Sequence, residues 1–145
     1  MSEGSVTELW ARCKKEPYSV LLGIEVLEIK PGYARVAMRF CPDMQNIFGM
    51  LHGGAVFSLL DEAFQLACNA RGEFAVAQQV STYFLAAASP GARLIAEAKE
   101  INATRKTALY DVRVVEEAND RLLATAQALA YRKGGKLPAD KLSGE

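Results

Sequence analysis

The sequence predicts an α+β fold in which one long central helix packs against a mainly antiparallel sheet of about six strands. The helical pattern runs from Gly53 to Ala70, with apolar residues at three- and four-residue steps. Four strand-like segments follow it, and no helix-length segment separates them. Parallel neighbours would need long crossovers, so these strands should pair antiparallel. Because the helix is apolar over much of its circumference, we expect the sheet to wrap around it.

The N-terminal half begins with a short amphipathic helix over residues 5–15, which Pro17 should stop. A strand is predicted over residues 22–30, where the apolar phase slips between Val26 and Leu27. The slip indicates either a bulge or a strand buried on both faces. A Pro-Gly turn then leads into the clean alternation of residues 33–40, so the two strands should form a hairpin.

The C-terminal half is predicted to be all strand after the long helix. Residues 41–52 lack a period and form a loop before that helix. The uncharged run from Phe74 to Ala92 nearly reaches the length of a membrane span, but glutamines interrupt it and Pro90-Gly91 closes it, so we interpret it as a buried strand. Residues 134–145 should be a loose tail. The four predicted strands cover residues 75–86, 93–103, 107–116 and 121–132.

Composition and charge fit a single domain over residues 1–145, with a core from about residue 18 to residue 133. Hydrophobic residues make up 50% of the chain, and 17 Lys and Arg balance 17 Asp and Glu. A zero net charge gives no electrostatic reason to expect nucleic acid or a membrane as a partner, and it does not oppose self-association. The chain opens without the basic, apolar leader of a secreted protein, so we expect it to be cytoplasmic.

The cysteines favour free thiols over disulfides or metal ligands. Cys13, Cys41 and Cys68 are odd in number and widely spaced. We therefore expect buried thiols in a reducing compartment, no metal site and no cofactor.

Chemistry is predicted at the turn His52-Gly53-Gly54, which opens the long helix. The first N–H groups of a helix have no intrahelical partner, and the helix dipole favours negative charge beside them. Two glycines would let a carbonyl oxygen approach closely enough to be polarised. The alternative is that the glycines only allow a tight turn.

Asp61 lies seven residues after Gly54, close to two helical turns, so both should lie on one face with Phe57, Ser58 and Gln65. A carboxylate there could attack a substrate or activate water, and Glu62 points about 100° away. His52, the only histidine, could be a general base or orient a substrate, and Asn46 could add one hydrogen bond. The alternatives are a solvated Asp61, a capping or core His52, and a turn residue at Asn46.

The segment NIFGMLHGGAVFSLLD, residues 46–61, resembles the hot-dog fold acyl-CoA thioesterases, closest to the PaaI-like branch of the 4-hydroxybenzoyl-CoA thioesterase superfamily. The shared pattern is Asn46, then His-Gly-Gly six residues later, then Asp61 nine residues after the histidine. The order of one long helix followed by four strands agrees, and the resemblance covers roughly residues 18–133.

The resemblance implies a role for each matched position. Asp61 would be the nucleophile or general base, and the Gly54 amide, with Gly53, would polarise the thioester carbonyl. His52 and Asn46 would orient the thioester or the attacking water. Members of this family are dimers, often paired into tetramers, with the site between subunits, so the resemblance implies at least a homodimer and favours a homotetramer.

The resemblance also suggests contacts for the rest of an acyl-CoA. Ser81, Thr82 and Tyr83 would line the acyl pocket and pantetheine channel, and Arg105 and Lys106 would lie near the nucleotide phosphates. One departure concerns the stretch where relatives often have Phe-Leu-Arg-Pro. This chain has Phe-Leu-Ala-Ala over residues 84–87, so the arginine is missing.

Three functions remain open at this point. The first is hydrolysis of an acyl-CoA to free acid and CoA, with no metal or redox cofactor. The second is a non-catalytic acyl-CoA sensor or carrier, which would not need the Asp61 carboxylate. The third is a hot-dog dehydratase acting on 3-hydroxyacyl thioesters, whose motif this chain resembles less.

Overall fold

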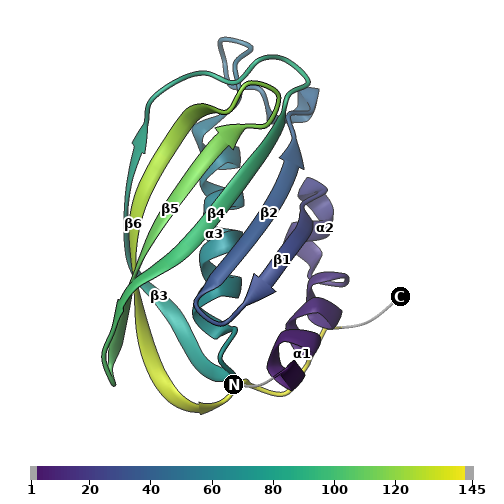
Figure 1. Cartoon of the computed structure of the whole chain (residues 1–145). Coiled ribbons are helices and arrows are strands. Elements are labelled where there is room, and N and C mark those ends of the chain that lie inside the picture. Colours follow the sequence, from purple (N-terminus) through teal and green to yellow (C-terminus); the bar gives the residue numbers. More distant parts are fainter. Residues whose placement is uncertain (1–2, 143–145) are drawn as a thin grey trace.

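The computed structural model describes residues 3–142 and shows one long helix held against a six-stranded sheet (Figure 1). Two short helices come first, α1 (Glu3–Cys13) and α2 (Pro17–Leu22). A hairpin of β1 (Glu25–Lys30) and β2 (Tyr33–Arg39) leads through a 3-10 turn, η1 (Pro42–Met44), to the long helix α3 (Gly53–Asn69). The strands that follow are β3 (Glu73–Phe84), β4 (Arg93–Ala103), β5 (Thr107–Glu116) and β6 (Arg121–Lys136).

All pairs in the sheet are antiparallel, and the strand order is β1-β2-β4-β5-β6-β3. The predicted α+β hot-dog architecture is therefore confirmed, and α3 contacts all six strands. Of the two alternatives for the slip after Val26, the structure has the bulge, seen as a register shift between Val26 and Glu28 in β1. Among residues 3–142, no helix combines the length and apolarity that crossing a membrane requires.

The core lies between the buried face of α3 and the inner face of the sheet. Leu59, Leu60 and Phe64 have almost no exposed surface, and the Phe64 ring meets Tyr110 edge-on with 5.6 Å between centroids. Small side chains dominate the facing strands, which lets the sheet approach and curve around the helix. These are the buried alanines Ala96, Ala98, Ala124, Ala126, Ala128 and Ala130.

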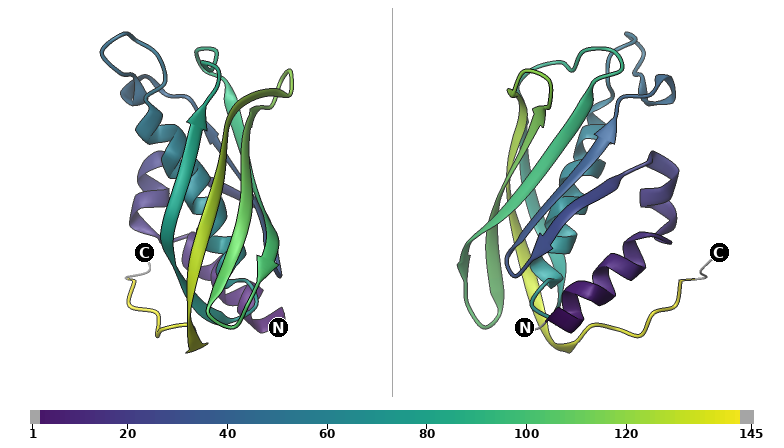
Figure 2. Two further views of the ribbon diagram at one scale, coloured as in Figure 1. Left: turned by 90° about the vertical axis from the view of Figure 1, so that its left-hand side faces the viewer. Right: turned by 45° about the vertical axis from the view of Figure 1, so that its right-hand side comes forward.

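Pro17 begins a helix, whereas the sequence predicted only that it would stop one. Helix α1 ends at Cys13, and Pro17 takes the first position of α2, where its missing N–H is not needed. The next strand consequently starts at Glu25 instead of residue 22. Helices α1 and α2 lie on the side of α3 away from β5 and β6 (Figure 2).

Two expectations about the C-terminal half are wrong for the single chain. The run from Phe74 is not a buried strand, because β3 lies at the sheet edge with most residues after Ala75 exposed. The stretch after Lys136 is not a loose tail up to residue 142. Leu137 packs against the core, and Lys15 pairs with Asp140 at 2.7 Å.

Candidate active site

His52 caps the N-terminus of α3. Its backbone is extended, and its Nδ1 accepts a hydrogen bond from the Gly54 N–H at 2.8 Å. A Cβ on Gly54 would lie 3.1 Å from that nitrogen, so glycine keeps the cap unstrained. The capping interpretation of His52 is thus confirmed. The Gly54 amide, expected to polarise a carbonyl, donates to His52 in this structure.

The cap also determines which ring nitrogen of the neutral His52 imidazole carries the proton. Because Nδ1 of His52 accepts a hydrogen bond, the proton of the neutral ring sits on Nε2. A protonated Nε2 is a donor and has no lone pair for removing a proton. His52 is therefore suited to orienting a substrate oxygen and not to acting as a general base.

Gly53 supplies the backbone N–H of the turn that is free to bind a ligand. Among residues 3–142, the structure describes no acceptor for the Gly53 N–H. The Phe84 ring lies 3.5 Å from where a Cβ on Gly53 would be. Beside this turn an apolar groove of about 400 Å³ runs between α3 and the end of β3, so an apolar ligand group could lie next to the open amide. The groove is lined by Met50, Leu51, Gly53, Val56, Phe84, Leu85, Ala86, Ala87, Ala88 and Leu123.

Asn46 shapes the loop in front of the turn. Its Oδ1 accepts hydrogen bonds from the backbone N–H of Phe48 at 2.8 Å and of Met50 at 3.0 Å. The turn-residue interpretation is therefore confirmed. Because the oxygen is engaged by donors, the Nδ2 amide of Asn46 is the end left for a ligand.

Asp61 lies on the less buried face of α3, where the spacing placed it. Gly54, Phe57 and Gln65 are exposed on this face, and Ser58 and Asp61 are half-buried. Burial, and then the nearby charge of Glu16, raise the pKa of the Asp61 carboxyl. Among residues 3–142, no hydrogen bond or ion pair engages this carboxylate, which leaves it available for chemistry.

Ser58 has its hydroxyl committed within the protein. Its Oγ donates to the Gly54 carbonyl at 2.8 Å and lies 2.8 Å from the Tyr18 hydroxyl of α2. Ser58 therefore anchors α2 to α3 one turn before Asp61.

Glu16 is the residue near the site that the sequence did not reveal. It precedes α2, but its side chain makes no capping hydrogen bond. Instead it accepts from Gln65 Nε2 at 3.3 Å, beside Glu62. Glu62 is buried, and burial together with the Glu16 carboxylate raises the pKa of Glu62 to about 9. Only the fold places a residue 46 positions earlier against this helix.

The three candidates on β3 do not share a side of the sheet. Ser81 and Tyr83 pair with Gln127 and Thr125 and line a shallow hollow on the outer face. Thr82 points inward, and its hydroxyl is buried without a described partner within residues 3–142. Within a single chain, Thr82 therefore faces α3, whereas Ser81 and Tyr83 lie on the outer face of the sheet.

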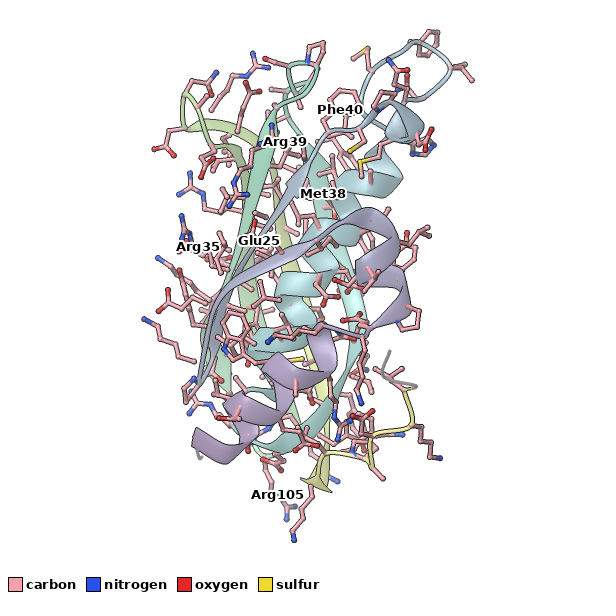
Figure 3. All side chains as sticks on the ribbon, turned by 90° about the vertical axis from the view of Figure 1, so that its right-hand side faces the viewer. Glu25, Arg35, Met38, Arg39, Phe40 and Arg105 are labelled. Carbon is pink, nitrogen blue, oxygen red and sulfur yellow. The ribbon has the colours of Figure 1, made fainter. Side chains whose placement is uncertain are left out.

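Arg105 and Lys106 lie far from the helix N-terminus in the same chain. They occupy the turn between β4 and β5, where Thr104 Oγ1 accepts from the Lys106 N–H at 3.3 Å. Figure 3 shows Arg105 at the opposite end of the molecule from Phe40, which leads into the loop before α3. Helix α3 alone spans about 25 Å, so these cations do not reach the Gly53 amide within one chain.

All three cysteines are free, but they are not all buried. Cys41 is exposed, Cys68 is half-buried, and Cys13 is buried. Burial is the main cause that raises the pKa of both Cys13 and Cys68 to about 12, so neither is a reactive thiolate at neutral pH.

Comparisons with known proteins agree with this architecture. The model of the thioesterase superfamily matches residues 48–123, which include the turn, Asp61 and β3 to β5. A protein of Archaeoglobus fulgidus is 42% identical over 86% of this chain and 80% of its own length. Acyl-coenzyme A thioesterase PaaI of Escherichia coli is 33% identical over 82% of this chain and 84% of its own.

A solved structure extends the likeness to three dimensions. The PaaI protein from the phenylacetic acid degradation operon of Escherichia coli superimposes with a TM-score of 0.87 at 29% identity, over 93% of this chain and 98% of that one. A protein of Thermus thermophilus is 39% identical, with a TM-score of 0.76 over 80% of this chain and 97% of its own. The chain belongs to the thioesterase superfamily, in its PaaI-like hot-dog branch, and is a thioester hydrolase.

Proposed function

We propose that this chain hydrolyses acyl-CoA thioesters to a free acid and CoA, with Asp61 as the catalytic carboxylate. The observation that carries the proposal is a half-buried carboxylate, unpaired within residues 3–142, on the same face of α3 as the turn with the free Gly53 N–H. The Escherichia coli relative is named as an acyl-coenzyme A thioesterase, which supports CoA as the thiol. Asp61 either attacks the thioester carbonyl itself or removes a proton from water that attacks it.

The turn supplies the matching donors. The Gly53 N–H and the Nε2–H of His52 would polarise the thioester carbonyl and stabilise the oxyanion that forms from it. The Asn46 Nδ2 would orient the thioester or the attacking water. The Gly54 N–H would join them only if His52 releases it, because the cap engages it.

The proposed site is completed by a second copy of the chain. Seven residues of helix separate Gly54 from Asp61, which places their backbones about 10 Å apart along the axis. That is too far for one carbonyl to touch both turn and carboxylate of the same helix. An antiparallel partner helix would bring the turn of one copy to Asp61 of the other, and the same pairing would bring Arg105 and Lys106 within reach of the nucleotide phosphates.

The exposed surface supports such a dimer. The 12-residue strand β3 pairs only with β6 among the described residues, and a long open edge of this kind is a ready site for strand pairing. Large apolar side chains are exposed near the site. They are Ile47, Phe48, Met50, Phe57, Tyr83, Phe84 and Leu85.

The first test measures thiol release from a panel of aryl-, phenylacetyl- and medium-chain acyl-CoAs. We expect D61N to lower turnover by about 100-fold or more, the usual size of a lost acid–base contribution. D120N is the matched control, because Asp120 lies in the β5–β6 turn with φ 61°, which asparagine tolerates. Wild-type turnover by D61N would refute the role of Asp61. Binding without any thiol release would support a sensor, and water loss from a 3-hydroxyacyl-CoA would support a dehydratase.

Two further measurements define the mechanism. If Asp61 is a general base, a single turnover in ¹⁸O-labelled water places the label in the acid product alone. If Asp61 is the nucleophile, CoA leaves as an acyl-aspartyl anhydride forms, and label enters the Asp61 side chain when water opens that anhydride at the aspartyl carbonyl, so label in Asp61 identifies the nucleophile. Mixed dimers of D61N and H52A test the shared site. If the two residues come from different chains, one site of the mixed dimer is intact and activity returns. If they come from one chain, every site is damaged and no activity returns.

A further inference from the structure

Three side chains with metal-ligating atoms, two from the N-terminal segment and one from the long helix, meet between that segment and α3. Cys13 ends α1, Glu16 lies in the linker before α2, and Glu62 lies in the middle of α3. The Cys13 sulfur and one oxygen from each carboxylate all lie within 4.8 Å of one another. The sequence predicted no metal ligands because its cysteines form no close pair, and only the fold brings Glu62, 46 residues after Glu16, to the other two.

Glu62 can ionise in the interior only if it gains a positive partner, and the residues from 3 to 142 do not supply one. Its side chain is 6% exposed, and its Oε2 is fully buried with no hydrogen-bond partner among residues 3–142. Its other oxygen accepts a long hydrogen bond, 3.3 Å, from Gln65, and a hydrogen bond with the Glu16 carboxyl helps to raise the pKa of Glu62. Burying the ionised form would cost several kcal/mol, roughly, so Glu62 holds a proton at neutral pH unless a cation takes the place of that proton.

The neighbouring cations form their ion pairs with other carboxylates, although the Nε of Arg12 is buried without a described partner. Arg12 pairs with Glu8, and Lys15 pairs with Asp140 at 2.7 Å. Within residues 3–142, none of the ion pairs that the structure describes includes Glu16 or Glu62. Two carboxylates and a thiol therefore face one another without a described counter-charge.

We infer that Cys13, Glu16 and Glu62 bind a divalent zinc ion, with water as the fourth ligand. One sulfur with two carboxylate oxygens is a donor set that suits zinc better than calcium or magnesium. Binding would form the Zn–S and Zn–O bonds as the Cys13 thiol and the Glu62 carboxyl each release a proton to solvent. Unlike the Asp61 site, this one would be structural, since it would join the N-terminal helices to α3.

The three ligand atoms lie close enough together to form such a site after a small adjustment. Ligand atoms around a tetrahedral zinc stand about 3.4–3.6 Å apart, so atoms now within 4.8 Å need to close by about 1 Å. The Gln65 amide already donates to the Glu16 and Glu62 carboxylates, as an outer partner does when it fixes metal ligands. A cavity of about 420 Å³ lined by Cys13, Glu16 and Gln65 gives an ion a path from solvent.

The test uses the tag-free, full-length protein, stripped with a chelator and titrated with Zn²⁺ by calorimetry and with Co²⁺ by absorption. We expect about one ion per chain and a thiolate-to-cobalt charge-transfer band in the near ultraviolet. The band should vanish in C13S and persist in C68S, the matched control, because Cys68 lies outside the group. E62Q keeps the shape of Glu62 and should weaken Zn²⁺ binding by more than about 10-fold.

Two results would overturn the inference. Equal Zn²⁺ binding by the wild type, C13S and E62Q would mean adventitious surface binding. Absence of saturable binding in the wild type would mean that a proton shared by Glu16 and Glu62 neutralises the pair. Neither result would bear on hydrolysis, which is measured separately through Asp61.

Discussion

Asn69 should control the stability of the whole helix–sheet unit, because it joins the end of α3 to the start of β3. Its side chain is buried, and Oδ1 accepts the Ala75 N–H at 2.9 Å. Its Nδ2 donates to the Ala75 carbonyl at 3.0 Å and to the Gln65 carbonyl at 3.0 Å. One amide thus satisfies both backbone groups of a buried strand residue.

Replacing Asn69 with alanine would leave the N–H and C=O of Ala75 unpaired in the interior. Each buried unpaired group costs about 1–3 kcal/mol, and alanine regains about 0.5 kcal/mol through its higher helix propensity. We therefore expect N69A to lower the free energy of unfolding by about 2–5 kcal/mol. For a chain of this size the midpoint temperature should fall by roughly 8–20 °C.

The assay is urea unfolding followed by circular dichroism and tryptophan fluorescence at one fixed protein concentration. N69D is the informative companion, since its carboxylate keeps the acceptor for the Ala75 N–H but loses the donor. It should be destabilised as well, with a repulsive contact at the Ala75 carbonyl. S81A is the control, because Ser81 is exposed and accepts only one exposed side-chain hydrogen bond. A change below about 0.5 kcal/mol in N69A would refute the reasoning.

The remaining predictions concern the cap, a buried carboxylate and the core. H52N can still accept the Gly54 N–H and should keep stability within about 0.5 kcal/mol, whereas H52A should lose about 1 kcal/mol. Both should lose turnover in the thiol assay, and full activity in H52N would exclude an imidazole donor. The Ser89 N–H lowers the pKa of Glu116, so this carboxylate stabilises the fold above its ordinary pKa and ceases to do so as pH falls through its lowered value. In urea titrations, E116Q should reduce the fall in unfolding free energy at acidic pH. A pH profile identical to that of the wild type would contradict this role of Glu116. L60A, at a position with 0% exposure, should cost about 3 kcal/mol in the same titration, and a loss under about 1 kcal/mol would contradict close packing there.

The sequence predicted the elements whose signals are local. The bounds of β4 and β5 agree with the prediction, and clean alternation of buried and exposed residues marks β5. The shared face of Gly54 and Asp61 also follows from helical spacing alone. The bulge in β1 was visible as a break in the alternation.

Features that depend on distant partners were not predictable. The burial of β3 was overestimated because an apolar strand has the same pattern at a sheet edge as at its centre. Glu16 carries no motif, and its contact with Gln65 exists only once α1 and α2 lie along α3. The His52 cap was one of two interpretations of the sequence, and only the 2.8 Å bond to Gly54 decides between them.

The strand order has a consequence for how the chain is made. Strand β3 leaves the ribosome long before its partner, since 48 residues separate Val80 from the Ala128 it pairs with. At typical rates of synthesis this delay lasts several seconds, roughly, during which α3 has formed but one flank of it stays bare. The groove beside the Gly53 turn needs both Phe84 and Leu123, so it is assembled only when β6 arrives. A nascent chain should therefore be unable to bind substrate until β6 has been added and has paired with β3.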